Sequence, residues 1–471
     1  MSTRFRNGLF KAIGLVFCLL TASDSFAQER LGSVIGRVRA RLLQAEHDGK
    51  FSGVVLVAKG DRILLNEGFG WADPFIGVRN TESKRFMIAS VSKAFVAASI
   101  LQLQEKGLLS VNDFIQQHLP EYPAWASENI QIHHLLTHTS GIPDYINDFP
   151  LKFKLKQFTG WTPARKELIA SFQNRPLNFF PGEDFKYSNS GYVLLARIVE
   201  NVSGMDYEKY VARHILEPLG MDNTGMGDFD KIGNRAVAFK GTSAKKKQID
   251  NFKSEWIYGM GEIYSTTHDL NKWLMSFSDT LILSEASKKQ MFTPALHNYA
   301  YGWHVYDVFG RSQYSHGGYL PGWNSYVFFY PEDTLSVIVL SNLENSNPME
   351  ICGNISRVVF MNGLDQAPPV QDDKYAGRYA LEDPSHESEV PFEADIVTVN
   401  EEEGNLRVKT PKGKTLRFTR IAQDQWHDTR HEVQIQIRET GGGLVLQVSQ
   451  GDKEWRWRKL SGDYRPATLS R

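Results

Sequence analysis

Strand-like segments stand at both ends of residues 31–362, and the region between them is mostly helical. Near the amino end, Gly53–Lys59 and Arg62–Gly68 are rich in aliphatic residues and flank Gly60 and Asp61, a pair typical of a hairpin turn. Four strand-like segments return after the helical region: Tyr301–Val308, Gln313–His316, Ser325–Tyr330 and Leu335–Leu340. Because a sheet must bury its apolar faces, the economical fold is one antiparallel sheet completed by both ends of this region.

Helical periodicity marks the flanks and the interior of the same region. Leu31–His47 precedes the first strands, and Asn347–Asn362 follows the last ones. Both segments are placed to cover the sheet, while the helices between Ser90 and Thr293 form an inserted subdomain. The predicted fold class is therefore α+β, an antiparallel sheet flanked by helices with an inserted all-helical subdomain.

The character of the chain changes after Asp365–Lys374, a segment rich in proline and polar residues that we interpret as a linker. Short alternating segments follow, separated by turn residues: Asp395–Val399, Leu406–Thr410, Thr415–Arg420, Val433–Arg438, Leu444–Ser449 and Glu454–Leu460. Such a pattern is typical of a small antiparallel β-barrel. A chain of 471 residues usually has more than one core, so we predict a first domain over 28–364, a linker over 365–374 and a barrel domain over 375–471.

The first 27 residues have the composition of a signal peptide. Three basic residues precede an apolar run over Ala12–Ala22, and Ser25 and Ala27 are small residues at the cleavage positions. The apolar run is too short to span a bilayer comfortably, which disfavours a retained anchor. We therefore expect residues 1–27 to be removed and the protein to be periplasmic or extracellular.

Cysteine count and net charge exclude several classes of site. Cys18 lies in the apolar run of the signal peptide, so Cys352 is left without a disulfide partner. A zinc site built on cysteines is excluded for the same reason. The formal net charge of −1 gives no basic excess, whereas binding to nucleic acid requires a clustered positive surface. The expected partner is a small-molecule or peptide substrate and not a nucleic acid.

A serine and a lysine three residues apart open a long apolar helix, Ala94–Gln104. Positions three apart share a helix face, so Lys93 can place its amine beside the hydroxyl of Ser90. A serine is a poor nucleophile until a base accepts its proton, and partial burial with neighbouring positive charge can lower the pKa of a lysine enough for that role. The pattern alone is weak, because it also occurs at Ser243 and Lys246, where no apolar helix follows.

Tyr187 and Asn189 form the second candidate element. A phenol close to Lys93 can relay a proton to a leaving group, and an amide has donors and an acceptor with which to orient Lys93 and a substrate carbonyl. The alternative is a turn that caps the helix Tyr192–Val202, and for this motif in isolation the turn is favoured.

His316, Gly317 and Gly318 form the third candidate element, which we place at the end of a strand. Glycines let a substrate backbone approach an edge strand closely. The backbone N–H of Tyr319, together with that of Ser90, can form an oxyanion hole, in which one donor is worth about 3 kcal/mol of transition-state stabilisation. The alternative is a glycine turn with a bystander histidine.

The order and spacing of the three elements resemble the penicillin-recognising serine hydrolases, which include serine β-lactamases and D-alanyl-D-alanine carboxypeptidases. The class C β-lactamase branch fits best, with S-x-x-K, then Y-x-N, then K/H-x-G, and Leu135–Ile142 and Ser265–Leu270 also resemble that branch. The resemblance covers residues 31–362 and implies a mixed sandwich of helices and sheet with an inserted helical domain, and no metal or organic cofactor. It implies catalytic roles for Ser90, Lys93 and Tyr187, and substrate binding by Asn189, His316, Gly317, Gly318 and Tyr319. The barrel resembles the lipocalin-like tail domains attached to some of these hydrolases.

Two residues depart from the pattern of true β-lactamases. The third motif usually starts with a lysine, which is charged at pH 7, whereas His316 is mostly neutral, so recognition of a substrate carboxylate should be weaker and pH-dependent. Histidine here resembles the peptidase, D-aminopeptidase and esterase-like members. Glu262 stands where relatives commonly have glycine, and if it faces the cleft it favours a cationic group such as a substrate amine.

Two other features have competing interpretations. His134 and His138 have the spacing of a metal-binding pair on a helix, and His133 adjoins them. A third ligand is missing, so the structural loop of the family is favoured. Trp323 follows Pro321 and Gly322 in a loop near the third motif, where it either lines the cleft or packs in the core.

These patterns predict a secreted serine hydrolase that forms an acyl-enzyme on Ser90. The candidate substrates are D-amino-acid peptides, β-lactams and small esters. The alternative is a non-catalytic binder of a ligand or of cell-wall peptidoglycan that keeps the fold and uses the barrel as its partner module. Intact Ser90, Lys93 and Tyr187 argue against that alternative.

Overall fold

The structure is a computed structural model, and it describes most of the chain. The described residues are 32–148, 163–241, 245–308, 310–363, 375–382, 396–402, 405–410, 415–422, 425–428, 433–440, 443–450 and 453–460. The predicted signal peptide, residues 1–27, and the predicted linker, residues 365–374, lie outside these ranges. No helix in the described ranges is long and apolar enough to cross a membrane.

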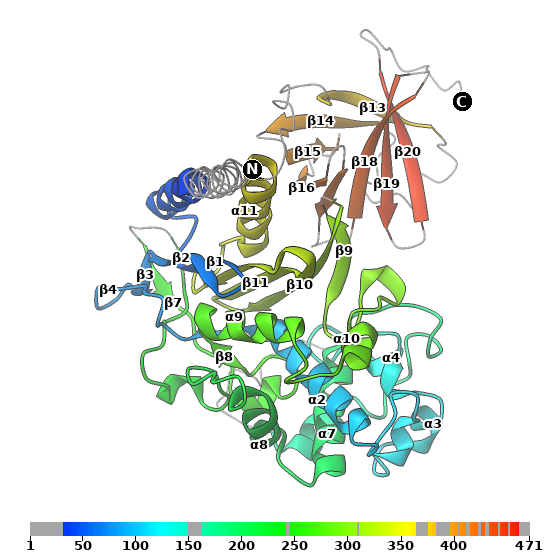
Figure 1. Cartoon of the computed structure of the whole chain (residues 1–471). Coiled ribbons are helices and arrows are strands. Elements are labelled where there is room, and N and C mark those ends of the chain that lie inside the picture. Colours follow the sequence, from blue (N-terminus) through cyan, green and yellow to red (C-terminus); the bar gives the residue numbers. More distant parts are fainter. Residues whose placement is uncertain are drawn as a thin grey trace, which may run out of the picture.

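A six-stranded antiparallel sheet joins the two ends of the first part of the chain, as predicted (Figure 1). Its spatial order is β2 (Arg62–Phe69), β1 (Gly53–Lys59), β12 (Leu335–Ser341), β11 (Trp323–Tyr330), β10 (Arg311–Leu320) and β9 (His304–Val308). Strand β1 is the meeting point, because Gly53 lies opposite Phe69 on β2 and opposite Ser341 on β12.

Both faces of the sheet are covered, which explains the nearly continuous apolar runs in β1 and β12. On β1, Val55 and Val57 face a core completed by the helix over residues 32–47 and by α11 (Pro348–Gly363). Val54 and Leu56, which alternate with Val55 and Val57 along the strand, face the larger core built with the helical subdomain. Complete burial of one such side chain contributes about 1.5–3 kcal/mol.

The helical subdomain is built around α2 (Lys93–Glu105) and α7 (Asn189–Ser203), which pack against each other. Helix α2 is buried from Lys93 to Leu103 and is mostly apolar, as expected for a central helix. The other helices and turns are η1 (Ala89–Ser92), η2 (Ile115–Gln117), α3 (Ala124–Ser127), α4 (Ile132–Leu136), α6 (Arg165–Ala170), α8 (Tyr207–Val211), η3 (Ala212–Leu216), η4 (Phe229–Lys231), η5 (Ser254–Ile257), α9 (Thr267–Met275), η6 (Ser276–Ser278), α10 (Glu285–Met291), η7 (Leu296–Asn298) and η8 (Pro331–Asp333). Short paired strands are β3 (Trp71–Asp73) with β4 (Val78–Arg79), β5 (Phe86–Met87) with β8 (Tyr264–Ser265), and β6 (Phe239–Lys240) with β7 (Lys247–Gln248).

The carboxyl-terminal strands close into an eight-stranded antiparallel barrel in sequence order, as the alternating pattern predicted. The strands are β13 (Gly377–Leu381), β14 (Ile396–Glu402), β15 (Asn405–Lys409), β16 (Thr415–Ala422), β17 (Gln425–Asp428), β18 (Val433–Thr440), β19 (Gly443–Gln450) and β20 (Lys453–Lys459). Strand β13 closes the barrel by pairing with both β14 and β20. The sequence pattern missed β13 and β17, and the shorter of the two, β17, contributes a single apolar residue, Trp426, to the barrel core.

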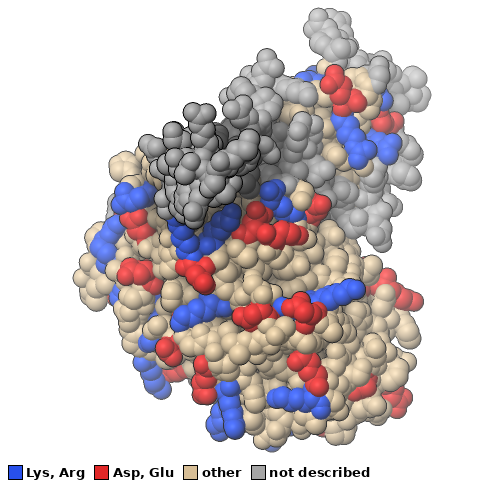
Figure 2. All heavy atoms as spheres, in the orientation of Figure 1, with Lys and Arg blue, Asp and Glu red and all other residues tan. Residues whose placement is uncertain are grey.

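Charged side chains of both signs are interspersed on the face of the molecule seen in Figure 2. No continuous basic patch covers the described part of that face. This surface offers no stripe of positive charge for a polyanion.

Candidate active site

Ser90 lies on a tight turn at the base of the central helix. The short strand β5 leads into the 3₁₀ turn η1, and η1 leads directly into α2. Ala89, the residue before Ser90, has a φ of 47°, in the left-handed region that non-glycine residues rarely adopt. Strain of this kind costs on the order of 1–3 kcal/mol and is concentrated at functional sites. The turn leaves Ser90 partly exposed between two buried segments.

The amine of Lys93 lies within hydrogen-bonding distance of the Ser90 hydroxyl. Lys93 Nζ is 3.0 Å from Ser90 Oγ, 2.8 Å from Asn189 Oδ1 and 3.1 Å from the carbonyl oxygen of Met260. The side chain is completely buried, and burial lowers the pKa of Lys93 from 10.5 to about 7. An amine with that pKa is available as a neutral base near pH 7.

The charges around Lys93 have the opposite sign to the one predicted. The sequence suggested that neighbouring positive charge helps to lower its pKa. The charged neighbours are instead the carboxylates of Asp144 and Glu262, and both raise the pKa of Lys93 against the effect of burial. Desolvation of the ammonium group is therefore the whole source of the lowered pKa.

Asp144 is a site residue that the sequence did not reveal. It is 1% exposed, and its carboxylate oxygens accept hydrogen bonds of 3.0 and 3.2 Å from Asn189 Nδ2. The N–H of Ile146 and the side-chain amide of Asn147 donate to the same carboxylate at 3.0 and 2.6 Å. Asp144 comes two residues after Leu135–Ile142, the segment that resembles the family, and that adjacency was its one available signal.

The ring of Tyr187 lies close to the amine of Lys93. Lys93 Nζ lies 4.9 Å from the centre of the Tyr187 ring. On its other side, Tyr187 packs against the imidazole of His138, with ring centres 4.1 Å apart. His138 is buried, and its Nδ1 accepts a 3.2 Å hydrogen bond from the backbone N–H of Ser188. The histidine thus supports the loop that carries Tyr187, in keeping with the structural interpretation of the His133–His138 segment.

The sequence placed the third motif at the end of a strand. In the structure it lies within strand β10. Strand β9 pairs with β10 only over Arg311–Ser315, so the outer edge of β10 from His316 onward is free of a strand partner within the described residues. A side chain at Gly318 would place its Cβ 2.2 Å from the carbonyl oxygen of Ile88, just before the Ser90 turn. The glycine therefore lets this strand edge approach Ser90 closely.

His316 is buried and neutral. Its Nδ1 lies 2.6 Å from the carbonyl oxygen of Gly317, and its Nε2 lies 3.0 Å from the hydroxyl of Tyr299. A carbonyl only accepts, so Nδ1 carries the proton and Nε2 accepts from Tyr299. Burial, with His304 and Lys93 nearby, holds the pKa of His316 well below its usual range. The pH-dependent recognition of a carboxylate that the sequence suggested therefore has no titrating group here near pH 7.

A cleft of about 1070 Å³ opens above these groups, and we name it the Ser90 cleft. Its walls include most of the predicted site residues: Ser90, Tyr187, Asn189, His316, Gly317, Gly318 and Tyr319. Lys93 lies buried directly beneath the floor, held by its bond to Ser90. Predicted site residues from three separate segments of the chain thus converge on one hollow.

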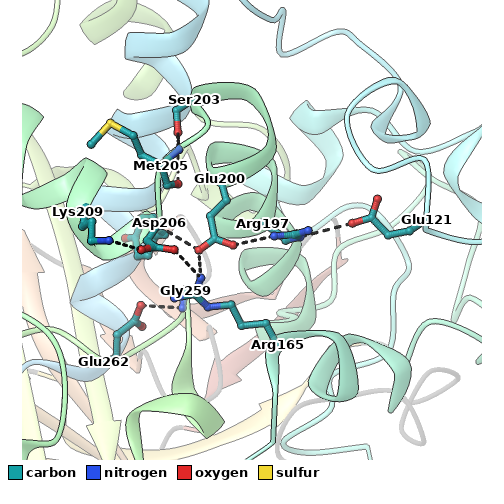
Figure 3. Close-up of polar contacts among 11 residues, drawn as sticks. Glu121, Arg165, Arg197, Glu200, Ser203, Met205, Asp206, Lys209, Gly259 and Glu262 are labelled. Carbon is teal, nitrogen blue, oxygen red and sulfur yellow. Dashed lines mark hydrogen bonds and ion pairs between the residues drawn. The ribbon is translucent and has the colours of Figure 1, made fainter.

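Glu262 and Trp323 do not line the Ser90 cleft. The carboxylate of Glu262 is 4% exposed and accepts hydrogen bonds from the N–H groups of Gly259 and Gly261, at 2.8 and 3.2 Å. It lines a separate small hollow together with Arg165, which forms an ion pair with Glu200 (Figure 3). Glu262 therefore does not meet the condition, facing the cleft, under which the sequence predicted that it favours a substrate amine.

Trp323 begins strand β11 instead of lying in a loop. It is 1% exposed, packs edge-on against Phe86 and Phe229, and donates from its indole nitrogen to Asn251 at 2.7 Å. Of the two alternatives that the sequence left open, packing in the core is the correct one.

Comparison with known proteins places this chain among proteins with the same fold. The family described as Beta-lactamase matches residues 38–358. The putative penicillin-binding protein PbpX of Bacillus subtilis (strain 168) is 33% identical over 300 residues, which are 63% of this chain and 72% of that protein. The crystal structure of a penicillin binding protein from Bacillus halodurans is 30% identical, with a TM-score of 0.60, and covers 67% of this chain and 98% of its own.

A further structure shares the fold at lower identity. The D-amino acid amidase from Ochrobactrum anthropi SV3 is 20% identical, with a TM-score of 0.59, over 70% of this chain and 98% of its own. The family match includes the whole helical subdomain and every residue placed around the Ser90 cleft. The chain therefore belongs to the Beta-lactamase family.

Proposed function

We propose that this protein hydrolyses amide or ester bonds through an acyl-enzyme formed on Ser90. One observation carries the proposal, the 3.0 Å contact between Lys93 Nζ and Ser90 Oγ at a lysine whose pKa is about 7. A hydroxyl, an amine that is neutral in part near pH 7, and a cleft above them are the requirements for nucleophilic attack by a serine.

Acylation begins with the neutral form of Lys93. As Ser90 Oγ bonds to the carbonyl carbon of the substrate, its proton passes to Lys93 Nζ. The bond from that carbon to the leaving nitrogen or oxygen then breaks, and the proton moves from Lys93 to the leaving group, with the Tyr187 hydroxyl as the relay. The result is an ester on Ser90, a free amine or alcohol, and Lys93 neutral again.

Deacylation repeats the same steps with water. Lys93 accepts a proton from a water molecule that attacks the ester carbon, and the bond to Ser90 Oγ breaks as the proton returns to that oxygen. The products are a carboxylic acid and the free Ser90 hydroxyl. The same base serves both halves because the leaving group of the first step has left the cleft.

The N–H groups of Ser90 and Tyr319 are the proposed donors to the oxyanion. Two contacts support this role: the η1 turn packs against β10, and Ser325 Oγ on β11 donates to the carbonyl of Ile88 at 2.7 Å. These contacts hold the strand edge and the Ser90 turn together. Loss of one such donor typically lowers the rate by about a hundredfold or more.

The cellular site of the reaction is a second part of the proposal. The composition of residues 1–27 supports export, and a cleft of this size fits a peptide or a small ester. We propose periplasmic or extracellular action on D-amino-acid peptides, β-lactams or small esters, with cell-wall peptidoglycan as one source of such peptides.

The test uses a fluorophosphonate and a penicillin as covalent probes, each followed by intact-protein mass spectrometry and peptide mapping. We expect one adduct, located on Ser90, and no adduct on Ser90→Ala. The two proteins differ by one oxygen atom in the cleft, so the variant is a matched control. Failure of both probes on the wild type, together with no turnover in a panel of esters and amides, contradicts the proposal.

A further inference from the structure

The Ser90 cleft carries one carboxylate that none of the proposed steps uses. Glu344 lies in the turn after β12, is half-buried, and lines the same hollow as Ser90. Among the lining residues that the structure describes, it is the one acidic or basic side chain besides two histidines. Burial lowers the pKa of His304 to about 4 and holds that of His316 well below its usual range, so both are neutral near pH 7.

Two hydrogen bonds hold the Glu344 carboxylate in place. The hydroxyl of Tyr319 donates to Oε1 at 2.7 Å, and the backbone N–H of Gly322 donates to Oε2. Burial and the adjacent carboxylate raise the pKa of Tyr319 to about 12, so its hydroxyl keeps the proton and stays a donor. Each carboxylate oxygen has a second lone pair, so the group is fixed in direction and still able to accept.

Neither partner neutralises the charge of Glu344. A phenol and a peptide N–H are dipoles, and no ion pair within the described residues involves this carboxylate. A charge that is oriented, partly shielded from water and unpaired attracts a cation and repels an anion more strongly than an exposed one.

Tyr319 connects this charge to the reacting atoms. Its backbone N–H is one of the proposed oxyanion donors, and its side chain bonds Glu344. The residue before it, Gly318, lies against the turn that holds Ser90. A ligand with its carbonyl at Ser90 therefore has the Glu344 carboxylate within the same cleft.

We propose that Glu344 makes the cleft selective for esters and amides that carry an ammonium group, over their neutral and carboxylate-bearing counterparts. This inference rests on the proposed function, since it assigns the substrate class of the same cleft. The proposed preference for a positively charged substrate is the opposite of that expected for a site that recognises a substrate carboxylate. The sequence left open whether Glu262 faces the cleft and favours an amine, and Glu262 does not line the cleft.

The test compares substrates that differ only in charge. The 4-nitroanilides of glycine, β-alanine and 4-aminobutyrate place a free amine at increasing distances from the carbonyl, and each is paired with its N-acetyl form. We expect the wild type to prefer at least one free amine by about tenfold in kcat/KM, and we expect that preference to fall as salt is raised.

Glu344→Gln is the matched variant. Its amide oxygen can accept from the Gly322 N–H and its amide nitrogen can donate to the Tyr319 oxygen, so the turn keeps both hydrogen bonds. We expect the variant to lose the preference through a higher KM for the free amines, with the rates on the N-acetyl series within about twofold of wild type.

Glu332→Gln controls for the change in net charge. Glu332 lies on the turn between β11 and β12, where it accepts from the Ser312 N–H, and it is outside the cleft lining. This control should keep the wild-type preference. Equal rates for free and acetylated substrates in the wild type, or equal loss of preference in both variants, overturns the inference.

The two proposals fail in different ways. No probe adduct on Ser90 contradicts the acyl-enzyme. An adduct on Ser90 together with equal kcat/KM for the free and acetylated series contradicts the role of Glu344 alone.

Discussion

The side-chain oxygen of Asn189 accepts a 2.8 Å hydrogen bond from Lys93 Nζ, and this bond fixes which end of the amide faces the amine. The other end, Nδ2, faces the carboxylate of Asp144 at 3.0 and 3.2 Å. An amide accepts only through oxygen and donates only through nitrogen, so Asp144 and Lys93 impose the same orientation. Asp144 is thus a positioning residue, which acts on Lys93 through Asn189.

Asp144→Asn should slow turnover and move the acid limb of the pH–rate profile. The variant has one acceptor oxygen for three donors, so Asn189 loses its fixed orientation and kcat should fall by about tenfold. The negative charge of Asp144 raises the pKa of Lys93, so its removal lowers that pKa. Because the neutral amine is the active form, the acid limb of kcat/KM should shift to lower pH. A lower kcat together with an unchanged acid limb of the kcat/KM profile would show that Asp144 acts on packing alone.

Lys93→Met should change how stability depends on pH. The pKa of Lys93 is about 7 in the folded protein against 10.5 ordinarily, so between these values the unfolded chain binds more protons. The free energy of unfolding of the wild type should therefore rise with pH across that window, by up to about 1.4 kcal/mol per pH unit from this group. Denaturant unfolding of both proteins from pH 7 to 10 measures the difference. If the free energy of unfolding changed with pH in the same way in both proteins, the Lys93 amine would not be uncharged in the folded protein.

The sheet was largely predictable from sequence because β1 and β12 are continuous apolar runs, and because Gly60 and Asp61 mark the turn from β1 to β2. The third motif was misplaced because Gly317 and Gly318 look like a turn in sequence. In the structure they are strand residues whose missing side chains make room for the ring of Tyr326 and the carbonyl of Ile88. A glycine pair that ends a strand and one that permits close packing are identical in sequence.

The reacting residues could be chosen from their spacing and their resemblance to a family, whereas the electrostatics of the site could not. Asp144 and Glu344 lie in loops with ordinary polar composition, and only the fold shows that one is buried beside Asn189 and the other lines the cleft. Glu262 was the acid that stood out in the sequence, yet it faces backbone N–H groups behind the cleft wall. The sign and position of a charge depend on which loops meet, and spacing along the chain does not contain that information.

His316→Asn should leave both limbs of the pH–rate profile in place between pH 5 and 9. The pKa of His316 is well below its usual range, so the imidazole does not titrate in the working range. The shorter amide can still donate to the Gly317 carbonyl but removes the hydrogen bond between the imidazole and Tyr299, a loss of about 1 kcal/mol that should lower kcat/KM several-fold. Profiles of kcat/KM against pH for the two proteins decide the matter. Disappearance of a limb near pH 6 in the variant would identify His316 as a titrating group.

Gly318→Ala should abolish most of the activity without unfolding the protein. The new Cβ would lie 2.2 Å from the carbonyl oxygen of Ile88 and 3.1 Å from Ala89 Cβ, so β10 and the Ser90 turn have to move apart. Misplacement by about 1 Å costs about a hundredfold in rate, because the oxyanion donors no longer match the reacting carbonyl.

Gly261→Ala is the matched control for that variant. Gly261 borders the same residue, Ala89, but there an added Cβ would lie 3.6 Å away, in ordinary contact. The control should therefore keep its rate within a few-fold of wild type, and circular dichroism should show both variants folded. If the two variants lost activity equally, the approach of Gly318 to the Ser90 turn would not be what limits the rate. If Gly318→Ala alone loses activity and still reacts slowly with a fluorophosphonate at Ser90, the nucleophile is intact. The loss of activity then comes from displacement of the strand edge.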